Sequence, residues 1–302
     1  MHTNTHAPDT NTNMARDILG SDVREGYADV NGQRLHYVEA GTGPLIVLLH
    51  GFPEFWYAWR LQIQPLAAAG FRVVAPDTRG INLSSRPEGV AEYDVAKLAE
   101  DIRGLIHERG ADSAMLVGHD WGGSIAWTVA MNHPEVVRRL AILNAAHPRK
   151  LSRGLHHADQ LRRSWYFFFF DIPALPESVV RASDWHFFRH FLQDARPAYT
   201  EQEMARYVAA WSRPGASTAM INYYRSSVRT SKGADAKIRP VTAPTLVIWG
   251  QKDRYLGPDL AEPERADVPN LVRVERLADA SHWVHHDEPA RVNQLLAELG
   301  AG

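Results

Sequence analysis

The sequence predicts an α/β fold in which a mostly parallel sheet is flanked by helices and carries a helical insertion. Two observations lead to this prediction. Short apolar runs alternate with segments of helical spacing, and runs such as PLIVLLH at 44–50 are apolar throughout, which is typical of strands buried on both faces. The alternation stops over 148–238, where aromatic, histidine and arginine residues follow helical spacing without a strand signal.

Each element has its own sequence signal. The pair Asn31-Gly32 between two alternating segments is typical of a two-residue hairpin turn, and Leu98, Ile102 and Ile106 share one face of a predicted helix. The predicted strands are 27–30, 33–39, 44–50, 71–75, 114–117, 140–143, 245–250 and 271–277, and the predicted helices outside the insertion are 58–69, 94–109, 122–132 and 288–299.

These elements divide the chain into three predicted parts. Residues 1–20 are rich in threonine and asparagine and are expected to form a flexible leader. Residues 21–147 and 239–302 form the predicted core, and 148–238 form a predicted helical cap. An insertion at this point lies over the carboxyl ends of the strands, where open α/β sheets bind their ligands.

Composition excludes several classes of function. The 302 residues include no cysteine, which excludes disulfides and thiolate catalysis, and the net charge of −2 comes without a basic block that would indicate a nucleic-acid partner. No apolar run reaches the length of a membrane span, and the first residues do not resemble a signal peptide, so we expect a cytoplasmic protein. His186 and His190 have i, i+4 spacing without a glutamate base, so we expect no metal there. We expect no other cofactor. The oligomeric state stays open.

The strongest chemical signal is GHDWGG at 118–123, which follows a predicted strand and opens a predicted helix. This is the pattern of a strand-to-helix nucleophile elbow, with Asp120 in the place where serine is usual. Glycines suit the tight turn, and the helix N-terminus favours an ionised carboxylate. A simple helix cap is the plainer interpretation of Asp120. A carboxylate nucleophile attacks an sp3 carbon that bears a leaving group, which predicts epoxides or organohalides as substrates.

His282 is the predicted general base, and Asp253 is the acid predicted to orient it. Asp253 follows the predicted strand 245–250, and His282 lies between the strand 271–277 and the last helix. The order nucleophile, acid, histidine is the one that this elbow-bearing fold uses. Taken singly, Asp253 could be a turn residue and His282 a surface histidine, but their joint order favours catalysis.

An oxyanion hole requires two backbone N–H donors near the nucleophile. One is expected from Trp121, directly after Asp120, and the other from Phe52, in the loop that follows the strand 44–50. Pro53 fixes the turn of that loop, and its bond to Phe52 is hypothesised to be cis.

Together, five segments resemble the α/β-hydrolase-fold epoxide hydrolases, which are close to the haloalkane and haloacetate dehalogenases. They are HGFPEFWYAWR at 50–60, DTRGINLSS at 77–85, GHDWGG at 118–123, QKD at 251–253 and SHWVHHDEP at 281–289. The resemblance covers nearly the whole chain from about Tyr27. It implies two cap tyrosines that hydrogen-bond the oxirane oxygen: Tyr166, seven residues before Pro173, and Tyr224 in the motif NYYR at 222–225.

The expected function is therefore hydrolysis of a small apolar epoxide by water to a vicinal diol, through an ester on Asp120. The pocket is expected to include Pro53, Trp165, Phe170 and Trp283. A dehalogenase with the same nucleophile is the first alternative, although Phe52 stands where the haloalkane type tends to have asparagine. Trp121 and Ser124 stand where the fluoroacetate type has arginines, and Tyr166-Phe167 replaces its His-Trp. The second alternative is a ligand-binding protein without catalysis, in which a hydrolytic base would have no use.

Overall fold

A single eight-stranded sheet organises the part of the chain described by the computed structural model, residues 14–230 and 238–302. The strands lie in the order β1-β2-β4-β3-β5-β6-β7-β8, in which β1, β2 and β4 pair antiparallel and the others pair parallel. The strands are β1 Arg24–Val30, β2 Gln33–Ala40, β3 Leu45–Leu49, β4 Arg72–Pro76, β5 Ala114–His119, β6 Val137–Leu143, β7 Thr245–Gly250 and β8 Leu271–Leu277. The predicted mostly parallel sheet is thus confirmed.

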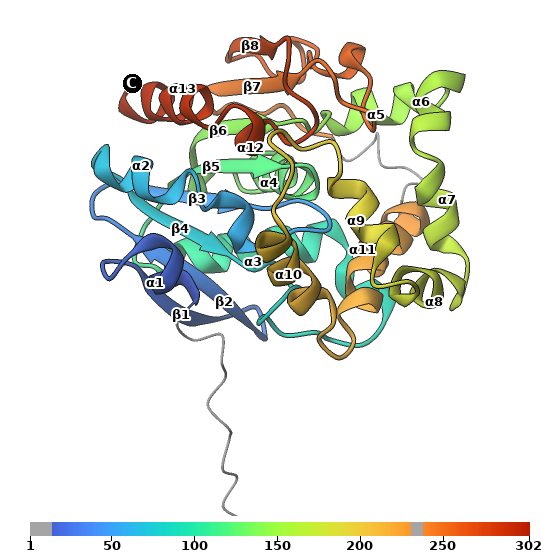
Figure 1. Ribbon diagram of the computed structural model, residues 1–302. Coiled ribbons are helices and arrows are strands. Elements are labelled where there is room, and N and C mark those ends of the chain that lie inside the picture. Colours follow the sequence, from blue (N-terminus) through green and yellow to red (C-terminus); the bar gives the residue numbers. More distant parts are fainter. Residues whose placement is uncertain (1–13, 231–237) are drawn as a thin grey trace, which may run out of the picture.

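Helices cover both faces of the sheet, and a group of them follows β6 (Figure 1). The helices outside that group are α1 Met14–Leu19, α2 Ile63–Ala68, α3 Val95–Glu108, α4 Trp121–Asn132, α12 Val284–Asp287 and α13 Pro289–Ala301, with short 3-10 turns η1 Trp56–Trp59, η2 Val90–Tyr93, η3 Pro134–Val136 and η5 Pro258–Leu260. Between β6 and β7 lie α5 Pro148–Gly154, α6 Ala158–Arg163, α7 Trp165–Asp171, α8 Leu175–Arg181, α9 His186–Leu192, α10 Glu201–Trp211 and α11 Ala216–Thr230, which we call the inserted helices.

The predicted hairpin turn is confirmed by the backbone of its two central residues. Asn31 and Gly32 have φ values of 50° and 72°, and Val30 pairs with Gln33 across the turn. Positive φ at both central positions is the conformation of a type I′ turn, which matches the twist of the two strands.

The predicted helix over 58–69 is wrong in its first half. The chain forms the 3-10 turn η1 and then begins α2 at Ile63. Pro65 explains the break, because a continuous helix would need its missing N–H and would bring its ring against the carbonyl of the preceding turn. In the first turn of α2 that N–H is not needed.

Residues 1–13 of the predicted flexible leader lie outside the described residues. The last part of that segment forms α1, in which Ala15 is fully buried and its N–H donates to Glu25 Oε1 at 2.8 Å. The expectation of a flexible leader is therefore wrong for residues 14–19, since a buried side chain and a hydrogen bond to β1 hold them.

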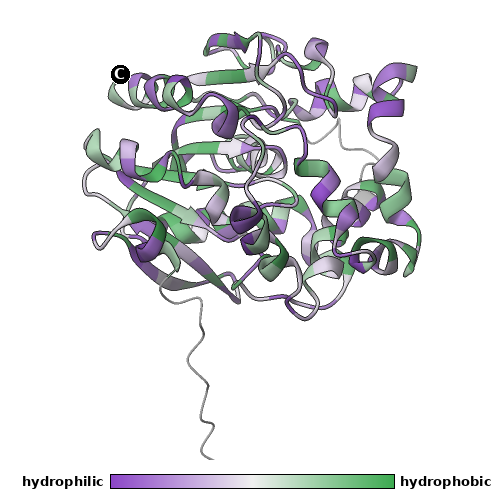
Figure 2. Cartoon of the chain, in the orientation of Figure 1, coloured by the Kyte–Doolittle hydropathy of each residue, from purple (hydrophilic) through white to green (hydrophobic). Residues whose placement is uncertain are grey.

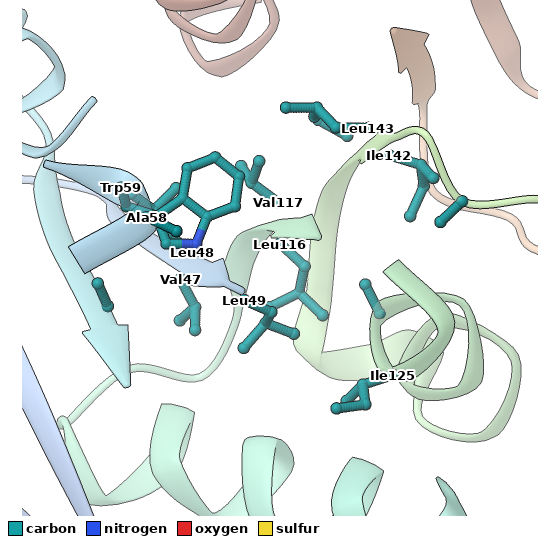
Figure 3. Packing of buried hydrophobic residues seen from close by; sticks show 14 of the residues in the cluster. Val47, Leu48, Leu49, Ala58, Trp59, Leu116, Val117, Ile125, Ile142 and Leu143 are labelled. Atoms are coloured by element: carbon teal, nitrogen blue, oxygen red, sulfur yellow. The ribbon is translucent and has the colours of Figure 1, made fainter. Parts of the chain in front are cut away.

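The core is densest around the central strands β3 and β5, which are buried along their whole length. Figure 3 shows Leu49 of β3 beside Leu116 of β5, with Trp59 among the labelled side chains near Leu48. The strands carry apolar residues continuously because helices cover both of their faces, and the hydropathy colouring of Figure 2 shows the same apolar centre. In the described part of the chain, no helix is long and apolar enough to cross a membrane.

Candidate active site

Asp120 lies at the sharp bend between β5 and α4, with φ 50° and ψ −118°. Close backbone packing explains the glycines around it. A Cβ on Gly122 would lie 2.1 Å from the Leu49 carbonyl oxygen, and one on Gly118 would lie 2.4 Å from the Gly122 carbonyl oxygen. The Asp120 carboxylate accepts no hydrogen bond as a cap of α4. The bend therefore presents the carboxylate away from its own helix, as an elbow does.

His282 stands between two carboxylates. Its Nδ1 lies 2.7 Å from Asp253 Oδ2, and its Nε2 lies 3.5 Å from Asp120 Oδ2. Asp253 follows β7, and its Oδ1 accepts the N–H groups of Tyr255 and Leu256 at 2.7 and 2.9 Å. The sheet thus brings together three residues that are up to 162 positions apart, Asp120 to His282, in the arrangement expected from their order.

The charges of this trio are mutually dependent. Burial opposes the charged form of His282, but the charge of Asp253 and the hydrogen bonds to both carboxylates raise its pKa to about 10. Burial likewise opposes ionisation of Asp120, yet the hydrogen bond and charge of His282 hold its pKa below the usual value. At neutral pH the resting site holds an imidazolium between two carboxylates.

Asn144 is a site residue that the sequence analysis missed. It directly follows β6, its Nδ2 donates to Asp253 Oδ2 at 2.7 Å, and its Oδ1 accepts the Gly250 N–H at 2.9 Å. Asn144 therefore holds both the Asp253 carboxylate and Gly250, the last residue of β7, in place. A polar residue at the carboxyl end of a buried strand is the signal that could have identified it.

The loop after β3 supplies a backbone donor at the nucleophile. The Phe52 N–H donates to Asp120 Oδ1 at 2.8 Å, and the Phe52–Pro53 bond is cis, as hypothesised. Trp121 is the first residue of α4, where backbone N–H groups have no partner within the helix. Phe52, Pro53 and Trp121 also line a cavity of about 10 Å3, which is close to the space that one water needs.

Tyr166 on α7 and Tyr224 on α11 lie side by side, with ring centroids 5.6 Å apart. Both are buried. Burial, followed by the negative charge of Asp120, raises the pKa of both phenols well above the usual value. Both hydroxyls are therefore protonated at neutral pH and available as donors near the nucleophile.

The other residues predicted for the pocket are distributed around the site. Trp165 lines a second cavity and is half exposed, and Pro53 accepts the Trp211 indole N–H at 2.6 Å. Phe170 and Trp283 are buried and line neither of these two cavities. The ring centroids of Phe170 and Tyr224 lie 4.9 Å apart, and those of Trp283 and His282 also lie 4.9 Å apart. Phe170 and Trp283 therefore pack against two site residues.

A buried cluster beneath the site was also missed. In it, Glu54 Oε2 lies 2.9 Å from His119 Nδ1, Glu54 Oε1 lies 3.3 Å from His285 Nε2, and His119 Nε2 lies 3.0 Å from the His282 carbonyl oxygen. Glu54 Oε2 also accepts the Gly51 N–H at 3.3 Å. The cluster thus ties the loop of the Phe52 donor to the loop of His282.

These three residues are also, within 14–230 and 238–302, the one group whose side chains could converge on a metal ion. Burial lowers the pKa of His285 to about 4 and leaves its imidazole neutral. Both ring nitrogens of His119 are already engaged, with Nδ1 2.9 Å from Glu54 Oε2 and Nε2 3.0 Å from the His282 carbonyl oxygen, whereas Glu54 Oε1 and both ring nitrogens of His285 have no hydrogen-bond partner. His186 and His190, the other candidates, do not belong to this group.

The order of the strands, the elbow at Asp120 and the Asp253–His282 pair together define a hydrolase of the α/β class. A family model described as the alpha/beta hydrolase fold matches residues 44–289, and this chain belongs to that family. The Bacillus subtilis AB hydrolase superfamily protein YfhM is 42% identical over 283 residues, which cover 91% of this chain and 97% of that protein. Epoxide hydrolase 4 of Homo sapiens is 37% identical over 276 residues, which cover 88% of this chain and 75% of that protein.

The fold is also that of a solved epoxide hydrolase. The crystal structure of Bacillus megaterium epoxide hydrolase in complex with an inhibitor has a TM-score of 0.83 and 33% identity, and the match covers 92% of this chain and all of that one. The resemblance recognised in the sequence motifs is therefore confirmed.

Proposed function

We propose that the protein is an epoxide hydrolase that converts a small epoxide and water into a vicinal diol. The observation that carries the proposal is one carboxylate at the elbow, Asp120, with two buried phenols, Tyr166 and Tyr224, near it. Relatives that carry the name epoxide hydrolase support it. A carboxylate is the nucleophile suited to an sp3 carbon, and a phenol is the donor suited to an alkoxide leaving group.

In the first step the Asp120 carboxylate attacks one ring carbon of the epoxide. A carbon–oxygen bond forms to Asp120 while the ring carbon–oxygen bond breaks, and the epoxide oxygen takes a proton from Tyr166 or Tyr224. The raised pKa of both phenols keeps that proton in place until an alkoxide develops. The product of this step is a hydroxyalkyl ester on Asp120.

In the second step His282 removes a proton from water, which attacks the carboxyl carbon of that ester. Esterification cancels the charge of Asp120, and that charge is one of the causes that raise the pKa of His282. The pKa of His282 consequently falls when the base is needed, and the proton that it loses restores the phenolate of the first step to a phenol, while Asp253 continues to orient the ring. The first step thus prepares the base for the second.

The oxyanion of the second step forms on the Asp120 carboxyl group itself. The Phe52 N–H already donates to that group, and the Trp121 N–H is proposed as the second donor. Collapse of the oxyanion then breaks the bond between the carboxyl carbon and the alkyl oxygen, which takes from His282 the proton removed from water and leaves as the second hydroxyl of the diol. The water oxygen stays in the Asp120 carboxylate. No cofactor takes part in either proposed step.

We further propose that the inserted helices act as the cap of this site and that residues 21–147 and 239–302 form its core. The inserted helices supply both phenols, and the core supplies Asp120, Asp253 and His282. A ring-opening donor and a hydrolytic base therefore come from separate parts of the chain.

A turnover panel tests this function directly. The panel is styrene oxide, 1-chlorobutane, fluoroacetate and p-nitrophenyl acetate, with the wild type and Asp120→Ala. We expect diol from styrene oxide alone and loss of that activity in the variant, because no other carboxylate lies at the elbow. Release of halide without diol formation would show a dehalogenase instead, and normal turnover by Asp120→Ala would remove Asp120 as the nucleophile.

A further inference from the structure

Asp287, the last residue of α12, joins two parts of the chain that are distant in the sequence. Its Oδ2 accepts the backbone N–H of Ser281 at 2.6 Å, and its Oδ1 accepts the backbone N–H of Arg196 at 2.7 Å. Ser281 directly precedes His282, the proposed base, whereas Arg196 lies between α9 and α10. In Figure 1 the segment between these two helices passes beside α12. One carboxylate thus links the loop of the base to the inserted helices.

Hydrogen bonds hold the loop of His282 on both sides of the base. After the base, the Trp283 N–H donates to Ser281 Oγ at 3.2 Å. The carbonyl oxygen of the base itself lies 3.0 Å from His119 Nε2. The contact between Ser281 and Asp287 is shorter than either, and a carboxylate accepts stronger hydrogen bonds than a neutral oxygen does. Asp287 therefore holds the residue before the base directly.

The segment between α9 and α10 fixes the orientation of Asp287 in turn. Besides the Arg196 N–H, this segment supplies the Pro197 carbonyl oxygen, which lies 2.7 Å from His286 Nε2. The Tyr199 ring also stacks on the His286 ring, with centroids 4.3 Å apart. His286 directly precedes Asp287, so two successive residues of α12 are fastened to the segment. A carboxylate with both oxygens engaged has lost most of its freedom to rotate.

We infer that Asp287 is a positioning residue for the second step, which holds the loop of His282 so that the imidazole reaches the attacking water. The inference rests on the proposed function. Asp287 acts through the Ser281 backbone and not on the substrate. A small displacement of a base slows proton transfer strongly, because the transfer requires hydrogen-bond distance. The first step uses Asp120 and the two phenols, which lie at the start of α4 and on α7 and α11, so its rate should change little.

The test compares Asp287→Asn with the wild type in single-turnover reactions of the full-length protein with styrene oxide. Asparagine has the shape of aspartate, but its amide group turns an N–H toward one of the two N–H donors. We expect ester hydrolysis to slow about tenfold while ester formation stays within about twofold of the wild type. Rapid-quench mass spectrometry of the intact protein and of the diol gives both rates, and the ester should accumulate during steady-state turnover of the variant.

Two further variants sharpen this comparison. Asp279→Asn is the matched control, because Asp279 lies two positions before Ser281, is exposed and pairs with Lys252 at 2.6 Å. It should leave both rates within about twofold of the wild type. Asp287→Glu keeps two carboxylate oxygens as acceptors, so it should hydrolyse the ester faster than Asp287→Asn. The amount of ester formed counts the folded active sites, so partial misfolding lowers that amount without changing the two rates.

The outcomes separate this inference from the proposed function. Unchanged hydrolysis of the ester by Asp287→Asn overturns the inference and leaves epoxide hydrolysis standing. Equal slowing of both steps also overturns it, because a displaced base affects the second step selectively. The same applies if Asp279→Asn loses as much as Asp287→Asn, or if Asp287→Glu hydrolyses the ester no faster. Absence of diol from the wild type contradicts the proposed function, and the inference then falls with it.

Discussion

At the scale of single residues, the environment of His282 sets the order of events. Two carboxylates lie beside its ring, and one of them, Asp120, is the proposed nucleophile that forms the ester. A histidine that begins protonated does not act as a base on water. In the proposed mechanism, formation of the ester on Asp120 is therefore the event that releases the proton from His282.

Substitution of this histidine separates the two proposed steps. His282→Gln keeps Asp120 and both phenols, so we expect the ester to form and then to persist because water is no longer activated. Intact-protein mass spectrometry with styrene oxide should show a mass increase equal to one epoxide. His107→Gln, at an exposed histidine near the end of α3, should show no increase. An unmodified His282→Gln protein exposed to a substrate that the wild type hydrolyses would contradict the ester mechanism.

At the scale of elements, one buried histidine joins three strands at the antiparallel edge of the sheet. His36 on β2 lies 2.7 Å from Asp77, which follows β4, and 3.2 Å from Glu25 on β1. Burial opposes its charge, but the hydrogen bonds to Asp77 and Glu25 prevail and raise its pKa to about 9. The charged imidazolium thus fastens the hairpin to the rest of the sheet.

This histidine predicts how stability depends on pH. Because its pKa is 6.5 unfolded and about 9 folded, its contribution is fully present below pH 6.5 and lost as the pH rises through 9. His36→Gln should lower the free energy of unfolding by about 3 kcal/mol at pH 6 and by much less at pH 10. Urea denaturation at the two pH values measures both. The exposed His156→Gln is the control, and a pH-independent loss would show that the charge contributes nothing.

The strands of the parallel sheet were predictable because burial on both faces leaves a continuous apolar run. The helix over 58–69 was mispredicted because apolar spacing outweighed Pro65, whose effect depends on where the helix begins. The elbow at Asp120 was predictable because local glycine spacing encodes it. The roles of Asn144 and Glu54 could not be predicted, since each is a single polar residue whose partners are distant in the sequence.

Tyr166 and Tyr224 were predictable only in part. Periodicity alone does not distinguish Tyr166 from its aromatic neighbours, and only the resemblance to a family motif singled it out. The structure places it beside Tyr224, which lies 58 positions further along the chain. Such a pairing depends on how α7 packs on α11, and helical spacing carries no information about that packing.

At the scale of the whole molecule, the two phenols come from the inserted helices and the triad from the remainder. We expect Tyr166→Phe or Tyr224→Phe alone to slow epoxide opening moderately, because the other phenol still donates. The double variant should lose about a thousandfold in the rate of ester formation. Single-turnover kinetics measure that rate.

Tyr223→Phe is the matched control for this experiment. Tyr223 is the neighbour of Tyr224 on α11, and its hydroxyl donates to the Arg79 carbonyl oxygen at 2.6 Å. Its loss removes a structural hydrogen bond and should leave ester formation nearly unchanged. Similar rates for the double variant and the wild type would show that another group protonates the epoxide oxygen.

The separation of the two phenols from the triad has a bearing on how such a protein can diversify. With the inserted helices as the proposed cap, changes among these helices are expected to alter which compounds react, while the proposed hydrolytic residues Asp120, Asp253 and His282 stay on the core. A library of variants restricted to these helices would therefore test new electrophilic substrates while keeping the residues that hydrolyse the ester.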